Sequence, residues 1–208
     1  MLLGVYDYTV ILTYFGLLTG YLGITLALHG DIGAAMFCLM GAGFCDMFDG
    51  KVASTKKNRT QKEKRFGIQI DSLSDLICFG VLPAVIVYKA CEGSDPAFYI
   101  SALYVLSALI RLAWFNVDEE ERQDQTDGAR AYYLGLPVTT SALILPLLLG
   151  IAHHLGIKLN VLAPVILFCM GLAFLIPFKL KKPQLAGKIG VLFCGGAELL
   201  ILLAGIDV

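Results

Sequence analysis

The chain has 208 residues, of which 57% are hydrophobic and 16% are charged, with a formal net charge of −1 and a mean hydropathy of +0.75. Soluble domains carry about 25% charged residues, so this chain has too few charges to cover a water-facing surface in the ordinary way. Lipid is therefore the expected solvent for most of it, and the charge balance gives no sign of a nucleic-acid partner.

Apolar stretches long enough to cross a bilayer follow one another along the chain. A membrane-spanning helix needs about 20 apolar residues, whereas strands of a barrel would be about 10 residues long with alternating polarity. We therefore predict an all-α, polytopic membrane helix bundle with about seven spans (about six to eight), forming one domain over residues 1–208. The predicted spans are Tyr8–Leu28, Ile32–Phe48, Ile70–Ala90, Ala97–Phe115, Val138–Leu155, Leu159–Phe178 and Ile189–Ile206.

Basic residues concentrate in alternate loops, which predicts the orientation of the bundle. The loop after the second span holds Lys51, Lys56, Lys57, Arg59, Lys62, Lys64 and Arg65. The loop after the sixth holds Lys179, Lys181, Lys182 and Lys188. Short cytoplasmic loops are enriched in lysine and arginine, so the N-terminus is expected in the cytoplasm of a multi-pass cell-membrane protein. No cleavable signal peptide is expected, because the N-terminus lacks a basic region.

The six cysteines lie in or beside the apolar stretches, and none forms a CxxC pair. A disulfide framework or a zinc site needs closer spacing in loops. The cysteines are therefore expected to be small apolar fillers of the helix bundle.

Four aspartates lie at the cytoplasmic ends of two consecutive spans. Asp46 and Asp49 are spaced i, i+3, and Asp71 and Asp75 are spaced i, i+4, so each pair lies on one helical face. One charged loop joins the two spans, which allows the pairs to face each other. Charged residues inside membrane spans are costly and usually functional. Helix capping or solvation explains one such acid more easily than four in this register.

Converging carboxylates repel unless protons or a divalent cation compensate their charge. A set of oxygen donors alone suits Mg²⁺ or Mn²⁺ better than zinc or copper. Two such metals about 4 Å apart would clamp a phosphoryl centre. The site therefore predicts metal-dependent chemistry on a phosphate group at the cytoplasmic face.

Several neighbouring residues are candidates for substrate contacts. Gly50 and Gly67 flank the charged loop and would let a bulky ligand approach the backbone. The basic loop residues could neutralise phosphates or could simply follow the positive-inside rule. Arg111 could bind a carboxylate or a phosphate, or could reach lipid headgroups. Ser72 could contact substrate, although serine is common in membrane helices.

The pattern D-x2-D-G-x2-A-…-G-x3-D-x3-D resembles the signature of the CDP-alcohol phosphotransferase family. Seven of its eight positions match, at Asp46, Asp49, Gly50, Ala53, Gly67, Asp71 and Asp75. The family usually has an arginine after the alanine, where this chain has Ser54, and the twelve residues before Gly67 make a longer loop than usual. Arg59 or a neighbouring lysine is the expected substitute for that arginine.

Within the family, the chain most resembles the phosphatidylserine synthases. The similar segments are DSLSDLICFGVLPA (71–84), RLAWFN (111–116) and YLGLP (133–137). The resemblance implies transfer of a phosphatidyl group from CDP-diacylglycerol to L-serine, giving phosphatidylserine and CMP, by a homodimer. It also implies that the four aspartates hold Mg²⁺ or Mn²⁺, and that Asp75 acts as general base toward the serine hydroxyl.

Two alternatives stay open. The same chemistry could use another acceptor alcohol, such as glycerol-3-phosphate, inositol phosphate or choline, because the basic loop could hold a phosphorylated acceptor. A divalent-cation transporter is a different class of protein that could also use the aspartates. Transport sites favour acids near mid-membrane and repeated halves with broken helices, whereas these acids lie at one face and no internal repeat is visible.

Overall fold

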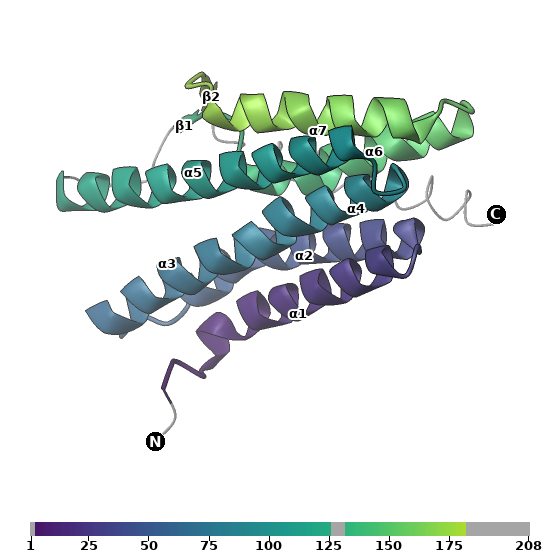
Figure 1. Ribbon diagram of the computed structural model, residues 1–208. Helices are drawn as coiled ribbons and strands as arrows, with labels where there is room; N and C mark the ends of the chain where they lie inside the picture. Colours follow the sequence, from purple (N-terminus) through teal and green to yellow (C-terminus); the bar gives the residue numbers. More distant parts are fainter. Residues whose placement is uncertain (1–2, 126–131, 182–208) are drawn as a thin grey trace.

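The computed structural model describes residues 3–125 and 132–181. Nearly all of these residues are helical (Figure 1). The α-helices are α1 (Tyr8–Leu28), α2 (Ile32–Ser54), α3 (Gln61–Asp75), α4 (Leu82–Ala90), α5 (Asp95–Gln125), α6 (Ser141–His154) and α7 (Leu159–Leu175). A π-helix, Leu76–Val81, joins α3 to α4 without a break, and a 3₁₀ turn, Val138–Thr140, precedes α6.

Four helical rods are long and apolar enough to cross a membrane by length and composition. They are Tyr8–Leu28, Ile32–Ser54, Gln61–Ala90 and Asp95–Glu121. The apolar helices Val138–His154 and Leu159–Leu175 are shorter. The predicted all-helical membrane architecture is confirmed at this level. The prediction of about seven spans is not confirmed, since the described residues form four helices of spanning length and two shorter apolar ones, and the seventh expected span, Ile189–Ile206, lies outside them.

The helices around the charged loop extend beyond the predicted apolar spans because polar groups cap them. The helix expected to end at Phe48 continues to Ser54, and the one expected to begin at Ile70 begins at Gln61. Thr60 and Glu63 form a reciprocal capping box at this start, in which Thr60 Oγ1 accepts from the Glu63 amide and Glu63 accepts from the Thr60 amide. Such a box satisfies two of the amide groups that a helix start leaves unpaired.

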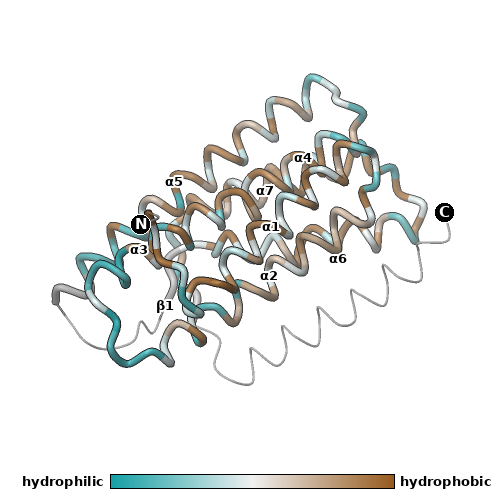
Figure 2. The backbone as a smooth tube through the Cα atoms, turned by 90° about the horizontal axis from the view of Figure 1, so that it is seen from below, coloured by the Kyte–Doolittle hydropathy of each residue, from teal (hydrophilic) through white to brown (hydrophobic). Residues whose placement is uncertain are grey.

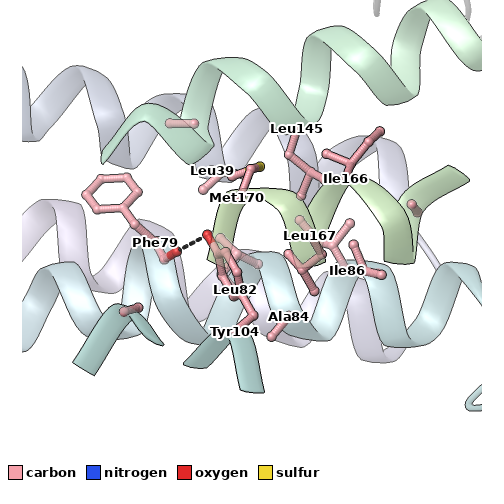
Figure 3. Packing of buried hydrophobic residues seen from close by; sticks show 14 of the residues in the cluster. Leu39, Phe79, Leu82, Ala84, Ile86, Tyr104, Leu145, Ile166, Leu167 and Met170 are labelled. Atoms are coloured by element: carbon pink, nitrogen blue, oxygen red, sulfur yellow. Dashed lines mark hydrogen bonds between the residues drawn. The ribbon is translucent and has the colours of Figure 1, made fainter. Parts of the chain in front are cut away.

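The rod formed by α3, the π-helix and α4 lies at the centre of the bundle, where it contacts α1, α2, α5 and α7. Its α4 half is buried among apolar side chains of the other helices (Figure 3). Leu82 and Ile86 are completely buried there, together with Leu145 of α6 and Leu167 of α7. Polar residues instead gather around the connection between α2 and α3 (Figure 2).

Helix α1 packs closely against its neighbours through a stripe of small residues. Gly16, Gly20 and Gly23 are all buried. A Cβ on Gly20 would lie 2.5 Å from Cys78 Sγ, and one on Gly23 would lie 2.8 Å from the Cβ of Cys38. Small residues at such intervals allow helix backbones to approach closely in membranes. This stripe brings α1 alongside both α2 and the π-helix.

A short antiparallel pair of strands, β1 (Tyr132–Leu134) and β2 (Lys179–Lys181), is the only strand structure in the described residues. Just after β1, the Gly135 amide donates to Phe178 O at 2.7 Å. Gly135 has φ +73°, a conformation that glycine adopts without a steric penalty. The segment that follows β1 is thereby held against the end of α7.

Candidate metal and active site

Helices α2 and α3 run antiparallel on either side of the charged loop, and they bring the two aspartate pairs together. The carboxyl groups of Asp46 and Asp75 lie within hydrogen-bonding distance of each other, as do those of Asp49 and Asp71. On each helix, one aspartate lies farther from the loop in sequence. These two, Asp46 and Asp75, lie next to each other. This pairing agrees with the i, i+3 and i, i+4 spacing, which places each pair on one face of its helix.

The four aspartates line a small cavity between α1, α2 and the α3–π-helix segment. Its volume is about 10 Å³, which is close to that of one water-sized sphere. Residues from α1, α2, α3 and the π-helix form the rest of the lining, namely Leu12, Thr13, Gly16, Ala42, Cys45, Ser74, Cys78 and Phe79. The cavity accommodates an ion, whereas a nucleotide would have to lie at its mouth.

The donor set fits a divalent cation. One carboxylate oxygen from each of Asp46, Asp49 and Asp71 lies within 4.8 Å of the other two. Opposite oxygen ligands on Mg²⁺ are about 4.2 Å apart, given Mg–O distances of about 2.1 Å. Among the described residues, no lysine or arginine lines the cavity. A cation is therefore the natural counter-charge for these acids.

Helix α1 contributes a contact that the sequence reading missed. Thr13 Oγ1 donates a hydrogen bond to Asp49 Oδ2 at 3.0 Å, and both side chains are buried. This bond fixes the orientation of one carboxylate in the candidate site. The stripe that includes Thr13, Gly16 and Gly20 was the available signal, because small and polar residues recurring on one face of an apolar helix indicate a packed face.

The loop between α2 and α3 holds its basic residues in different environments. Lys56 Nζ lies 2.7 Å from Asp7 Oδ2 and 2.8 Å from Glu63 Oε1. The hydrogen bond from Lys56 lowers the pKa of the Asp7 carboxyl to about 2, and the bond to Asp7 raises the pKa of Lys56. This lysine therefore ties the start of α1 to the start of α3.

Arg59 is the basic loop residue that lies against the signature glycine. Its Nη2 donates to Glu63 O at 3.2 Å, and a Cβ added to Gly67 would lie 2.7 Å from that same nitrogen. Its Nε is buried without a hydrogen-bond partner. Gly67 precedes Asp71 by one helical turn, so the guanidinium group lies on the loop side of the acid cluster.

Ser54, which stands where the motif has an arginine, lies on a surface that is partly open to solvent. Ser54 is exposed, and its Oγ donates to Lys51 O at 2.7 Å within its own helix. Ala53 is half-buried, whereas Gly50 is exposed, and nothing lies within 4 Å of a Cβ placed on Gly50. The surface beside Gly50 therefore has room for a ligand.

The remaining predicted residues lie beside the cavity or away from it. Ser72 Oγ donates to Asn116 Oδ1 of α5 at 2.9 Å, next to Asp71 in the chain. Arg111 is buried, donates from Nε to Leu136 O at 3.4 Å and lies over the Phe115 ring. Arg111 is not among the residues that line the cavity. The bond to Leu136 joins α5 to the segment after β1.

Comparisons with known proteins find sequences similar to this chain. The sequence profile described as CDP-alcohol phosphatidyltransferase matches residues 9–177. An archaetidylserine synthase from Methanothermobacter thermautotrophicus is 34% identical over 125 residues, which are 60% of this chain and 49% of the relative. A CDP-diacylglycerol–serine O-phosphatidyltransferase from Saccharomyces cerevisiae is 36% identical over 121 residues, 58% of this chain and 41% of the relative.

A CDP-diacylglycerol–serine O-phosphatidyltransferase from Mycobacterium tuberculosis is 29% identical over 146 residues, 70% of this chain and 49% of the relative. The chain thus spans about half the length, or less, of these curated relatives. The profile match covers both aspartate pairs, the basic loop and the helices that surround them.

Proposed function

The chain belongs to the CDP-alcohol phosphatidyltransferase family, and from this premise we propose that it transfers a phosphatidyl group from CDP-diacylglycerol to L-serine, releasing CMP. The observation that carries the proposal is the convergence of Asp46, Asp49, Asp71 and Asp75 on one cavity at the charged ends of two apolar helices. The names of the relatives support serine as the acceptor.

We propose that Asp46, Asp49 and Asp71 hold Mg²⁺ or Mn²⁺, with Asp75 completing the set. Their oxygen donors and mutual distances fit such an ion. When bound, it would neutralise the phosphate oxygens and the charge that develops on the leaving CMP. Thr13 has a supporting role, because its hydroxyl donates to Asp49 and limits how that carboxylate can rotate.

Asp75 is the proposed general base. As the serine hydroxyl oxygen forms its bond to the lipid-side phosphorus, the bond from that phosphorus to the CMP oxygen breaks, and the hydroxyl proton passes to an Asp75 carboxylate oxygen. No covalent enzyme intermediate is required. A carboxylate contributes to such a step mainly by being correctly positioned, and Asp75 lies beside Asp46 in the lining of the cavity.

The nucleotide is proposed to lie at the mouth of the cavity, over Gly50, Ala53 and Gly67. Arg59 takes the place of the missing motif arginine, because its guanidinium group lies against Gly67 and its Nε has no partner. Ser54 has no comparable reach, since its hydroxyl is bound to its own helix. An arginine at this position would contact phosphate oxygens through charge-assisted hydrogen bonds.

The acceptor is proposed to approach from the α5 side of the cavity. Ser72 and Asn116 form a polar pair there, adjacent in sequence to Asp71. Arg111 lies on the same helix as Asn116 and is a candidate partner for the serine carboxylate. Asn116 was absent from the predicted site, although it ends the segment RLAWFN that carries part of the family resemblance.

The finer membrane arrangement is also proposed. Seven spans, with the N-terminus and the active site on the cytoplasmic side, fit the charged connection between α2 and α3. CDP-diacylglycerol would then keep its acyl chains in the bilayer while its nucleotide lies in water. A homodimer in the cell membrane is expected from the family resemblance.

The experiment is CMP release by purified protein in detergent with CDP-diacylglycerol and Mn²⁺ or Mg²⁺. L-serine is compared with glycerol-3-phosphate, inositol phosphate and no acceptor, and each reaction is repeated with a chelator. Serine-dependent release that the chelator abolishes supports the proposal. CMP release with another acceptor but not with serine would refute serine as the acceptor. Absence of metal-dependent CMP release with every acceptor would count against the proposed transferase activity.

A further inference from the structure

The long helix changes its geometry directly after Asp75. The π-helix Leu76–Val81 separates the acid-bearing α3 from the apolar α4, and the Leu82 amide bonds to Ile77 O, five residues back. One extra residue in a helix rotates everything after it by about 100° relative to a regular α-helix. The π-helix therefore sets the direction of the Asp75 side chain relative to the packed face of α4.

A proline two residues beyond the π-helix leaves a carbonyl group without its regular partner. Pro83 has no N–H, so the carbonyl of Phe79 loses the bond that a regular helix would supply. Two hydroxyl groups from other helices donate to this oxygen, namely Tyr104 Oη of α5 at 2.8 Å and Ser141 Oγ of α6 at 3.4 Å. Figure 3 shows the bond from Tyr104.

Both donors are rigidly held. Tyr104 is 1% exposed and Ser141 is 0% exposed. The Tyr104 ring also packs on Phe174 of α7, with 5.3 Å between ring centroids. A buried carbonyl with two fixed donors has little freedom to rotate. Phe79 is meanwhile one of the residues that line the acid cavity, so the clamped residue is itself part of the candidate site.

We propose that Tyr104 and Ser141 are positioning residues, which clamp the Phe79 carbonyl and thereby fix the π-helix and the orientation of Asp75 in the acid cluster. The inference deepens the proposed function and rests on it for its activity readout. The clamp draws on α5 and α6, neither of which contributes a cavity-lining side chain among the described residues. Helices outside the cluster would thus control its geometry.

If the two hydroxyl groups had only a structural role, they would supply hydrogen bonds to the Phe79 carbonyl without affecting the acid cluster. A parallel exists in α7, where Pro164 frees the carbonyl of Asn160 and the Cys91 thiol donates to it at 3.5 Å, away from the acid cavity. The chain offers a closer control in Ser101, whose Oγ donates to Ala84 O at 3.1 Å. That bond also joins α5 to the central rod, but its acceptor lies in α4, beyond the π-helix.

The test compares Tyr104→Phe with Ser101→Ala. Each variant loses one buried hydroxyl-to-carbonyl bond between α5 and the central rod. Two quantities are measured in detergent: the rise in Tm on adding Mn²⁺, and the Mn²⁺ concentration for half-maximal CMP release. Tyr104→Phe should raise the Mn²⁺ requirement about tenfold, as is typical when a group supporting a metal ligand is removed, and should diminish the Mn²⁺-induced rise in Tm. Ser101→Ala should change neither.

Equal Mn²⁺ dependence in Tyr104→Phe and Ser101→Ala would overturn the inference. If Tyr104→Phe does not fold, Ser141→Ala replaces it, because it removes the longer of the two bonds to the Phe79 carbonyl. The Mn²⁺ requirement should then change in the same direction but by less. A wild-type Mn²⁺ response in Ser141→Ala would likewise refute the clamp. Absence of CMP release by the wild type would refute the proposed function, while the Mn²⁺-induced change in Tm would still decide the inference.

Discussion

The two halves of the helix from Gln61 to Ala90 differ in nearly every physical respect. In α3 most of the side chains are polar or charged, and Ser74 is the one buried residue. In α4 a majority of the side chains are buried and apolar, including Leu82 and Ile86. The π-helix lies between them. The difference indicates that one continuous rod separates chemistry from stability, with reactive groups in the first half and packing in the second.

The sharpest test of this division is Asp75→Asn in α3. The substitution keeps the shape of the side chain but removes the proposed base, so turnover should fall by at least about 100-fold. Thermal stability should hold or rise, because one of four adjacent carboxylates becomes neutral. CMP release and Tm are measured on the same preparation. Glu92→Gln, in the turn after α4, removes a carboxylate outside the cavity and should leave turnover unchanged.

Near-normal turnover in Asp75→Asn would exclude the general-base role. A large loss of Tm would instead show that the acid cluster is a structural element, and the contrast between the two halves of the rod would then disappear.

The reciprocal test is Ile86→Ala in α4. Ile86 is completely buried, so truncation should leave a cavity and reduce the free energy of unfolding by about 2–3 kcal/mol. Turnover of the protein that remains folded should stay close to that of the wild type, because Ile86 lies beyond the π-helix. Denaturant unfolding in detergent and CMP release report the two effects. A selective loss of turnover without loss of stability would mean that α4 takes part in the site directly.

A smaller effect is expected where Arg59 lies against Gly67 at the polar end of the rod. Gly67→Ala would displace the guanidinium group, since the new Cβ would lie 2.7 Å from Arg59 Nη2. Both Gly67→Ala and Arg59→Ala should raise the KM for CDP-diacylglycerol about tenfold, the equivalent of one charge-assisted hydrogen bond. The double variant should be no worse than Arg59→Ala alone, because both changes remove the same contact.

Lys57→Ala is the matched control, since Lys57 is an exposed basic residue of the same loop. Full additivity of Gly67→Ala and Arg59→Ala would show that the two residues act separately. A KM change in Lys57→Ala as large as that in Arg59→Ala would attribute the effect to the general charge of the loop.

The acid cluster could be predicted from the sequence because helical periodicity fixes which residues share a face. Asp46 with Asp49, and Asp71 with Asp75, needed only a hairpin connection to converge, and the structure brings them together. Lengths of apolar stretches likewise predicted the helices, with α1 matching its predicted span at both ends. Helix ends near the loop were misplaced, because the capping box of Thr60 and Glu63 extends α3 beyond its apolar part.

Contacts made across helices could not be read from periodicity. The local sequence does not show that Lys56 forms ion pairs while Arg59 lies against Gly67, because both belong to one run of basic residues. The π-helix is equally hidden, since Pro83 marks an irregularity without specifying its form. The bonds of Thr13 to Asp49 and of Tyr104 to Phe79 join residues 36 and 25 positions apart, so they depend on how the bundle packs.

The smallest effect is expected for the ion pair of Asp7 with Lys56, which joins the polar end of the rod to α1. The pKa of Asp7 is lowered from 3.8 to about 2, so the pair stabilises the folded state above about pH 4 and is lost as the pH falls through about 2. Asp7→Asn keeps the cap of α1, because asparagine caps helices as well as aspartate, and removes the charge alone. Its Tm should be slightly below wild type at pH 6, with the difference closing toward pH 2. An equal difference at both pH values would show that the effect does not depend on the charge of Asp7, and α1 would then be held by its glycine stripe with no help from the ion pair.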